Sequence, residues 1–396
     1  MSPRARGRDS FAGRLPITII TGFLGSGKST LLGTLLRHPE MNRAAVIVNE
    51  FGEVGIDHAL LEGSTESMTL LSNGCLCCAV RTDLQETLHE LFIKRRAGEV
   101  IDFDRVFIET TGLADPVPIM HALISDTMLA AHYRLDGVVT LVDAVNGSAT
   151  LAQMAEAVKQ VAVADRLVLT KTDLAPGTEI TALRAHLCAV NPQAQLLEAM
   201  RGVLDPTALS GLGLQRARTD EAALARWMGA AVNYTNADRV DHAELSPEAG
   251  HSAGINTFCV WFDTPFSWQS FTAIVQTLTS LRGPDLLRVK GLVHIAGESG
   301  PVVVQGAQHL FHEPATLEAW PSDDQRSRIV FITRGLEREA VESLCRAIGG
   351  QYPWHGPWRN EQLRRSGHRL CIDRLRHSVA RPAPYKGGGR GMRGDG

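Results

Sequence analysis

The strongest chemical signal in the chain lies at residues 22–29, which read GFLGSGKS. Glycine, lysine and serine at these spacings are typical of a phosphate-binding loop, in which backbone N–H groups and a helix N-terminus face the phosphates. In such a loop Lys28 neutralises the β- and γ-phosphates, and Ser29 binds Mg²⁺. The sequence thus predicts that a nucleoside triphosphate contacts Gly22, Gly25, Ser26, Gly27, Lys28, Ser29 and Thr30.

A second segment indicates which base is bound. Thr170, Lys171, Thr172 and Asp173 follow an apolar run at residues 167–169. The carboxylate of Asp173 can accept hydrogen bonds from N1–H and the exocyclic amine of guanine, two donors that adenine does not offer together, while the stem of Lys171 can cover the ring. Four residues are a weak signal alone. Together with the phosphate-binding loop they favour GTP over ATP.

Between these segments, an apolar run at residues 105–108 leads to Glu109 and then, after two threonines, to Gly112. A carboxylate in this place can act on the Mg²⁺ shell or on the attacking water, and the Gly112 amide can contact the γ-phosphate. The alternative is an ordinary strand end with a solvated glutamate. Because a phosphate-binding loop lies upstream, we assign catalytic roles to Lys28 and Glu109.

Three cysteines stand close together, at Cys75, Cys77 and Cys78. Thiolates are soft ligands for Zn²⁺ or a similar ion, but one such segment does not close a four-coordinate site. A further ligand must come from water or from elsewhere, the nearest candidates being Glu50, Glu53, Asp57 and His58. A disulfide switch and simple packing of buried thiols are the two alternatives to metal binding. We assign Cys75, Cys77, Cys78 and Glu53 to a transition metal, and Ser29 to Mg²⁺.

Composition limits the classes of protein that fit. The 396 residues carry 40 basic and 43 acidic side chains, a formal net charge of -3, and 44% are hydrophobic. This balance excludes a disordered chain and a globally basic nucleic-acid-binding protein. No apolar run approaches the roughly 20 residues of a membrane helix, and scattered cysteines are typical of a reducing compartment. We therefore expect a cytoplasmic protein that binds neither membrane nor nucleic acid.

The elements that must position these groups follow from the hydrophobic pattern. Up to about residue 196, short β-branched runs alternate with longer amphipathic stretches, which predicts an α/β domain with a mainly parallel sheet. The expected strands are at residues 17–21, 45–49, 105–110, 138–142 and 167–170, with a helix at 30–37. Further along, the pattern predicts a smaller α+β domain with strands at 257–262, 292–295, 302–305 and 328–333 and a helix at 268–281.

Changes in composition predict the domain boundaries. We expect a flexible N-terminus at 1–14, the P-loop domain at 15–215, a linker at 216–254, the α+β domain at 255–350 and an extension at 351–396. The extension ends in a basic, Gly-rich tail that is predicted to be disordered. All of the groups assigned above would then lie in the first domain.

Taken in order, the motifs resemble those of CobW-type GTPases, P-loop proteins related to the urease and hydrogenase maturation factors UreG and HypB. In the first half the resemblance rests on the phosphate-binding loop, the cysteine cluster, NEFGE at 49–53, ETTGLADP at 109–116 and TKTD at 170–173. In the second half it rests on LRVKG at 287–291, QHLF at 308–311 and RIVFI at 328–332, which resemble the CobW C-terminal domain.

The resemblance implies a GTP hydrolase that binds a transition metal, zinc or cobalt, at the cysteine cluster and delivers it to a client metalloprotein or cofactor-assembly protein. It also implies that the segment after the cluster lies near the nucleotide. The expected nucleotide contacts therefore extend to Cys78, Ala79, Val80, Arg81 and Thr82, beside Gly112, Thr170, Lys171 and Asp173.

Two further expectations concern how such a protein would work. The metal must bind the GTP form more tightly than the GDP form, because a ligand shifts an equilibrium only by its differential affinity. No arginine finger is evident, so intrinsic hydrolysis should be slow, with a homodimer contact, the client or the metal supplying the missing stabilisation. The competing hypothesis is a GTP-dependent redox switch that controls a protein partner without delivering metal.

Overall fold

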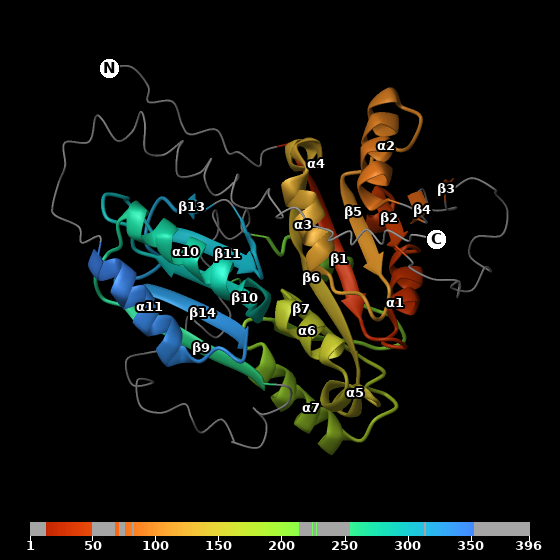
Figure 1. Ribbon diagram of the computed structural model, residues 1–396. Helices are drawn as coiled ribbons and strands as arrows, with labels where there is room; N and C mark the ends of the chain where they lie inside the picture. Colours follow the sequence, from red (N-terminus) through yellow and green to blue (C-terminus); the bar gives the residue numbers. More distant parts are fainter. Residues whose placement is uncertain are drawn as a thin grey trace, which may run out of the picture.

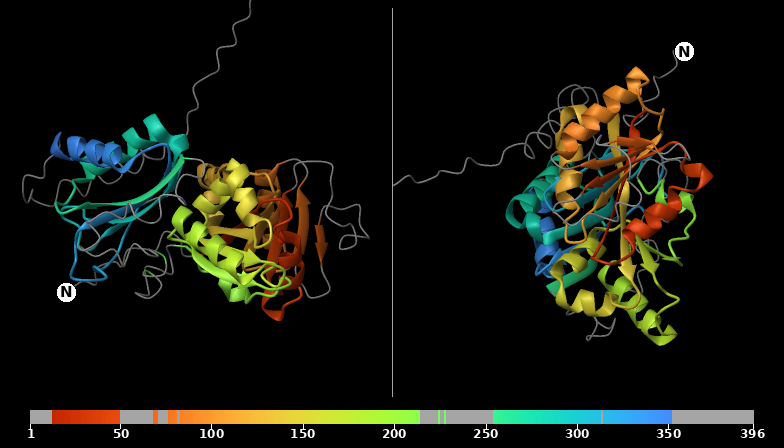
Figure 2. Two further views of the ribbon diagram at one scale, coloured as in Figure 1. Left: turned by 90° about the horizontal axis from the view of Figure 1, so that it is seen from below. Right: turned by 90° about the vertical axis from the view of Figure 1, so that its right-hand side faces the viewer.

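The computed structural model describes residues 13–49, 68–70, 76–80, 83–213, 224, 227, 254–312 and 314–351. Within these residues the chain forms two β-sheets, each covered by helices (Figures 1 and 2). The expected N-terminal segment, linker and C-terminal extension lie almost wholly outside the described residues. Among the helices that are described, none is both long and apolar enough to cross a membrane.

The first sheet has the strand order β3-β4-β2-β5-β1-β6-β7-β8. Neighbouring strands are parallel, except that β3 runs antiparallel to β4. The strands are β1 Leu15–Gly22, β2 Ala44–Asn49, β3 Met68–Leu70, β4 Leu76–Val80, β5 Arg105–Thr110, β6 Tyr133–Asp143, β7 Arg166–Thr170 and β8 Gln195–Ala199. The prediction of a mainly parallel α/β domain is thus confirmed.

Helices cover both faces of this sheet, which explains why its strands lack a clean apolar–polar alternation. Ile20 of β1 packs against Leu31 and Leu35 on one face, whereas Ile17 and Ile19 pack against helices on the other. The helices are α1 Lys28–Leu35, α2 Leu84–Ala97, α3 Val117–Ser125, α4 Thr127–His132, α5 Gly147–Gln153, α6 Ala155–Val163 and α7 Gly177–Val190, with 3₁₀ turns at Pro39–Met41 and Pro206–Leu209.

Strands β3, β4 and β8 were not predicted from the sequence, and β6 begins earlier than predicted. Strand β8 lies at the sheet edge and carries polar residues such as Gln195 and Glu198, so it lacks an apolar run. In β6, Asp136 interrupts the apolar pattern, yet its buried carboxylate forms an ion pair with Arg134 at 2.8 Å. In β4 the chemistry of the cysteines was considered and not the strand that carries Cys77 and Cys78.

The second sheet is antiparallel, with the order β12-β11-β10-β14-β9 and β13 paired to β11. Its strands are β9 Ile255–Phe262, β10 Leu286–Val293, β11 Val302–Ala307, β12 Leu310–Phe311, β13 Ala315–Thr316 and β14 Ser327–Arg334. Helices α10 Trp268–Arg282 and α11 Arg338–Gln351 pack side by side on one face, and a 3₁₀ turn at Gly283–Asp285 follows α10 (Figure 1). The smaller α+β domain is also confirmed.

The two domains share a buried interface. Leu287 of β10 and Ile332 of β14 belong to the same apolar cluster as Val158 and Val161 of α6. Strand β10 begins at Leu286, earlier than the predicted residue 292. The prediction placed the start too late because Arg288 and Lys290 interrupt the apolar pattern of the strand. Both side chains are almost completely buried, and both form ion pairs with Asp165, the residue before β7.

His312 lies beside this charged cluster and makes the interface sensitive to pH. Burial and the nearby charge of Arg288 lower the pKa of His312 to about 4, although Asp165 acts in the opposite sense and Lys290 adds to the lowering. An unfolded histidine takes up its proton near pH 6.5. Between pH 6.5 and pH 4 the unfolded state therefore binds more protons, so the free energy of unfolding must fall as the solution is acidified.

We expect acidification from pH 7 to pH 5 to reduce the free energy of unfolding by up to about 2 kcal/mol through His312 alone. Urea unfolding of the wild type and of His312→Gln at both pH values measures this contribution, because the variant lacks the titrating ring. A loss of stability that is equal in the two proteins would contradict the assignment.

Candidate functional site

Four neighbouring strands bring the predicted nucleotide contacts together. The carboxyl ends of β5, β1, β6 and β7 meet at one edge of the first sheet, and ligands of open α/β sheets bind at that edge. Strand β1 leads into the phosphate-binding loop, β5 leads to Gly112, β6 ends at Asp143 and β7 leads to Lys171. The topology therefore groups segments that are far apart in the sequence.

The phosphate-binding loop needs its glycines for geometric reasons. Gly25 has φ 74° and Gly27 has φ 90°, both in the left-handed region, which residues with a Cβ rarely adopt. A Cβ at Gly22 would lie 2.5 Å from the carbonyl oxygen of Leu141. Helix α1 begins at Lys28, so the N–H groups of its first turn have no partner within the helix and are available to an anion.

Lys28 is held inside this loop. Its Nζ donates to the carbonyl oxygen of Gly22 at 2.7 Å and to that of Phe23 at 3.3 Å. Burial lowers the pKa of Lys28, and the nearby carboxylate of Glu109 partly offsets the effect. A desolvated ammonium group beside the N-terminus of α1 suits a highly charged phosphate chain.

Ser29 and Glu109 form the second part of the site. The Ser29 hydroxyl donates to Oε1 of Glu109 at 3.2 Å, and Glu109 is only 4% exposed. The Ser29 hydroxyl and the Glu109 carboxylate thus place two oxygen atoms together beside the phosphate-binding loop, and oxygen atoms are the hard ligands that Mg²⁺ prefers. The residues present therefore fit a bound Mg²⁺ ion.

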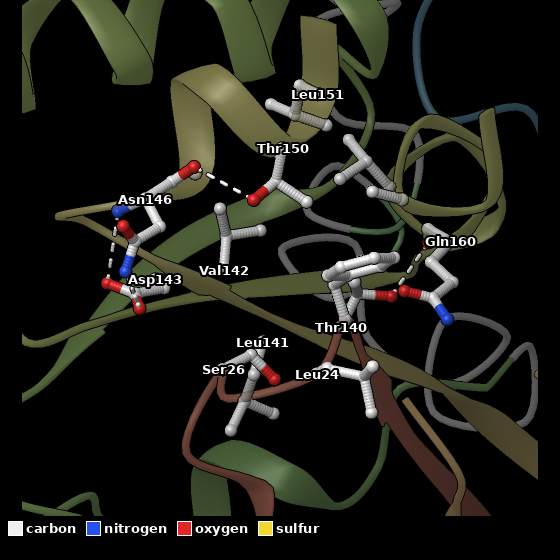
Figure 3. Close-up of a pocket in the computed structure, with 14 residues that line it drawn as sticks. Leu24, Ser26, Thr140, Leu141, Val142, Asp143, Asn146, Thr150, Leu151 and Gln160 are labelled. Carbon is white, nitrogen blue, oxygen red and sulfur yellow. Dashed lines mark hydrogen bonds between the residues drawn. The ribbon is translucent and has the colours of Figure 1, made fainter. Parts of the chain in front are cut away.

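The base segment is tied directly to the phosphate-binding loop. The Thr170 hydroxyl donates to the carbonyl oxygen of Ser26 at 2.8 Å. The hydroxyl of Ser26 is itself buried and has no hydrogen-bond partner among the described residues. It faces a pocket bounded by the end of β6, α5 and α6, in which Thr140, Asp143 and Asn146 also lie (Figure 3).

Lys171 and Asp173 diverge after β7. Lys171 has φ 57°, and its Nζ donates to Oδ2 of Asp143 at 2.7 Å. Partial burial of Asp143 opposes its ionisation, but hydrogen bonds from Lys171, from the Asn146 amide and from the backbone of Val145 outweigh this and lower its pKa. The Asp173 carboxylate lies 3.7 Å from Nε of the exposed Arg201, and its side chain is 29% exposed, so a base can reach its oxygens.

Gly112 lies against the phosphate-binding loop. A Cβ at Gly112 would lie 2.6 Å from the backbone nitrogen of Leu24, so the loop after β5 approaches as closely as a glycine allows. The Thr110 hydroxyl also donates to that of Thr21 at 2.8 Å, which joins β5 to β1 just before both loops begin. Sequence reasoning had placed Gly112 near the phosphates, and the structure brings it to the loop that would hold them.

The cysteine cluster reaches the same sheet through β4. Cys77 and Cys78 are in register with Val46 and Ile47 of β2, and the next pair, Ala79 and Val48, is in register with Glu109. Strands lie about 4.8 Å apart, so the backbones of β4 and β5 are separated by about 10 Å. The sheet thus places the two cysteines, with Ala79 and Val80, two strands from the strand that carries Glu109.

Several predicted residues lie outside the described part of the chain. They are Cys75, the candidate ligands Glu50, Glu53, Asp57 and His58, and the expected nucleotide contacts Arg81 and Thr82. Within the described ranges, no group of three or more histidine, cysteine or acidic residues is arranged to hold a metal ion. The metal assignment of Cys75, Cys77, Cys78 and Glu53 therefore stays a prediction.

Sequence reasoning missed Asp143 and Gln160. Asp143 had a signal, because it is a polar residue directly after the apolar run of a predicted strand. Gln160 had none, since a glutamine on an amphipathic helix is usually solvated. In the structure it is 1% exposed, and its Nε2 donates to the carbonyl oxygens of Gly112 and Ala114.

Comparison with known proteins identifies the family of each domain. Residues 16–198 match the family described as CobW/HypB/UreG, nucleotide-binding domain, and residues 255–348 match the cobalamin synthesis protein cobW C-terminal domain. The zinc chaperone YjiA of Escherichia coli is 32% identical over 335 residues, which cover 83% of this chain and 97% of that protein. The zinc-regulated GTPase metalloprotein activator 1 of Schizosaccharomyces pombe is 30% identical, with 83% and 85% covered.

A solved structure has a fold similar to that of this chain. The crystal structure of Zn(II)-bound YjiA GTPase from Escherichia coli superposes with a TM-score of 0.67 at 30% identity, covering 85% of this chain and 99% of that one. The likeness in fold therefore extends over nearly the whole of that relative. The chain belongs to the CobW/HypB/UreG family and joins its nucleotide-binding P-loop domain to a CobW C-terminal domain.

Proposed function

We propose that this protein is a GTP-hydrolysing metallochaperone that binds a transition metal at the cysteine cluster in a nucleotide-dependent way and transfers it to a client protein or cofactor pathway. Zinc is the first candidate because the relatives named above are a zinc chaperone and a zinc-regulated GTPase metalloprotein activator. Cobalt is the second, since thiolate ligands accept both ions. Family membership and the geometry of the phosphate-binding loop support the GTPase part.

The residues of the site have different roles in hydrolysis. The N–H groups of the loop and Lys28 bind the phosphates, while Ser29 and Glu109 provide oxygen ligands for Mg²⁺, which neutralises charge on the phosphates when bound. Glu109 is also placed to orient the attacking water, and the Gly112 amide to contact the γ-phosphate. We expect slow hydrolysis without a partner, because no arginine finger is assigned.

The register of the sheet is the observation that carries the link between metal and nucleotide. Ala79, the residue after Cys78, is in register with Val48 of β2, and Val48 is in turn in register with Glu109 of β5. A γ-phosphate that changes the loop after β5 therefore acts two strands away from the cysteines, and one that changes the loop after β1 acts three strands away. In this proposal the GTP form holds the thiolates in one geometry, and hydrolysis releases them.

A titration of Zn²⁺ and Co²⁺ into reduced, full-length protein tests the proposal. It compares protein without nucleotide, with Mg²⁺-GDP and with Mg²⁺ and a non-hydrolysable GTP analogue. We expect tight binding only with the analogue. Equal affinity in all three states would contradict nucleotide control, and nucleotide-dependent partner binding that survives chelation and responds to oxidants would favour the redox switch.

Base selectivity should depend on Asp173. In Asp173→Asn the side chain offers an amide donor in place of one carboxylate acceptor, which mismatches the amine of guanine but matches the carbonyl oxygen that xanthine carries at the same position. We expect kcat/KM for GTP to fall by about a hundredfold and that for xanthosine triphosphate to rise. Steady-state phosphate release with both nucleotides measures this, and an unchanged ratio would show that Asp173 does not contact the base.

A further inference from the structure

Helix α6 contacts the loop that follows Glu109. The amide Nε2 of Gln160 donates to the carbonyl oxygen of Gly112 at 3.2 Å and to that of Ala114 at 3.0 Å. The preceding residue, Lys159, forms an ion pair with Asp115. Two adjacent residues of α6 therefore hold three positions of one loop, including the glycine whose amide is expected to face the γ-phosphate.

Gln160 is built into the site rather than lying on its surface. It is 1% exposed, and its backbone oxygen accepts from the Thr140 hydroxyl at 2.7 Å (Figure 3). Its side-chain Oε1 is buried and has no hydrogen-bond partner among the described residues. A buried acceptor without a partner costs free energy, so an altered loop that offers an N–H to Oε1 would be favoured.

The C-terminal end of α6, one turn beyond Gln160, is held by the C-terminal domain. Arg288 of β10 donates from Nη1 to the carbonyl oxygen of Val163, the last residue of α6, at 2.6 Å. A guanidinium group at a helix C-terminus is favoured by the helix dipole. Arg288 is fully buried and also pairs with Asp165. Its position is therefore fixed relative to the end of the helix.

Asn191 and the apolar cluster make this end rigid. The Asn191 amide donates to the carbonyl oxygens of Val161, Ala162 and Ala164 at 2.8, 3.2 and 2.9 Å. On the side of the helix, the buried Val158 and Val161 belong to one cluster with Leu287 and Ile332 of the second sheet. A short helix fixed in this way moves as one body, so a displacement at Gln160 reaches β10.

We infer that Gln160 is a positioning residue for GTP hydrolysis and that α6 transmits the position of the loop at 112–115 to the C-terminal sheet through Arg288. The inference rests on the proposed GTPase function. Gln160 acts by orienting the Gly112 peptide, which contacts the nucleotide. Because coupling between two sites is reciprocal for binding, whatever binds to the C-terminal domain and shifts β10 changes the preference for GTP over GDP by the same factor.

The first test replaces Gln160 by methionine, which keeps the length of the side chain and removes both donors. We expect kcat for GTP to fall about tenfold while KM changes less than about twofold, because the loop is misplaced and nucleotide binding is kept. Gln153→Met is the matched control, since Gln153 is an exposed glutamine at the end of α5. A structural defect alone would change the melting temperature without this split between kcat and KM.

The second test follows the signal to the C-terminal domain. Amide hydrogen exchange of β10 is compared between Mg²⁺-GDP and Mg²⁺ with a non-hydrolysable GTP analogue in wild type, Gln160→Met and Arg288→Lys. Lysine keeps the charge but not the two-pronged donor geometry. We expect wild type to show a nucleotide-dependent difference at β10 and both variants to lose at least half of it, with Gln153→Met unchanged.

The outcomes separate this inference from the proposed function. If the wild type hydrolyses GTP but Gln160→Met keeps both kcat and the exchange difference, the role of α6 is wrong and the GTPase assignment stands. An absence of any nucleotide effect at β10 in an active wild type also overturns the coupling. If the wild type neither binds nor hydrolyses GTP, the proposed function fails and the inference falls with it.

Discussion

Replacing Lys28 by alanine is expected to reduce kcat/KM for GTP hydrolysis by about a thousandfold, because the variant loses the cation that stabilises charge on the transferred phosphate. The effect should be catalytic rather than structural. In the free protein the Lys28 amine is buried against the carbonyls of Gly22 and Phe23, and burial lowers its pKa. Burial of the charged amine therefore costs free energy in the folded state. Its removal should leave the fold intact. Phosphate release and thermal unfolding measure the two effects.

Lys94→Ala is the matched control for this variant. Lys94 lies on α2 and pairs with Glu90 at 2.7 Å, away from the edge where the nucleotide contacts meet. We expect wild-type hydrolysis from it. If Lys28→Ala retained hydrolysis within about tenfold of wild type, the phosphate-binding role of the loop would be wrong, since that role requires a larger loss.

Replacing Cys77 by alanine should weaken zinc binding about a hundredfold in the presence of a non-hydrolysable GTP analogue. Structural zinc sites bind with about 10–16 kcal/mol from four ligands, so one thiolate contributes about 3 kcal/mol. Competition with a chelating dye, with and without nucleotide, measures the change. The affinity of the wild type should also decrease as the pH is lowered, because the thiols must lose protons to bind the metal.

Cys188→Ala provides the control for the thiol chemistry. Cys188 is an exposed free cysteine on α7, so it offers an accessible thiol outside the predicted cluster. Its loss should leave zinc affinity unchanged. Unaltered affinity in Cys77→Ala would show instead that the cluster does not hold the metal, and a disulfide formed by its cysteines under oxidation would then favour the redox alternative.

Much of the fold was predictable because the first sheet is buried on both faces. Its central strands are continuous apolar runs, and each ends at a motif with recognisable chemistry, such as the loop before Lys28 or the segment at Thr170. The start of β10 was not predictable in this way. Arg288 and Lys290 interrupt its pattern, and the carboxylate of Asp165 that permits their burial lies in another domain.

The site was predictable where one short segment carries its own chemistry. The phosphate-binding loop is of this kind, whereas the contact of Asp173 with a base stays a prediction. The contacts of Gln160 depend on helix α6 packing beside a loop about 45 residues earlier in the chain. No local sequence pattern predicts such a long-range contact. The pairing of Ser29 with Glu109 is intermediate, because both residues were noticed separately and the sheet topology joins them.

The interface between the sheets also bears on how the chain unfolds. Val163 at the end of α6 lies in one apolar cluster with Ala307 and Leu310 of the second sheet, and the Thr257 hydroxyl of β9 donates to the carbonyl oxygen of Val190 at the end of α7. Each domain thus completes part of the other's interior. We therefore expect the two sheets to unfold together in one transition rather than independently.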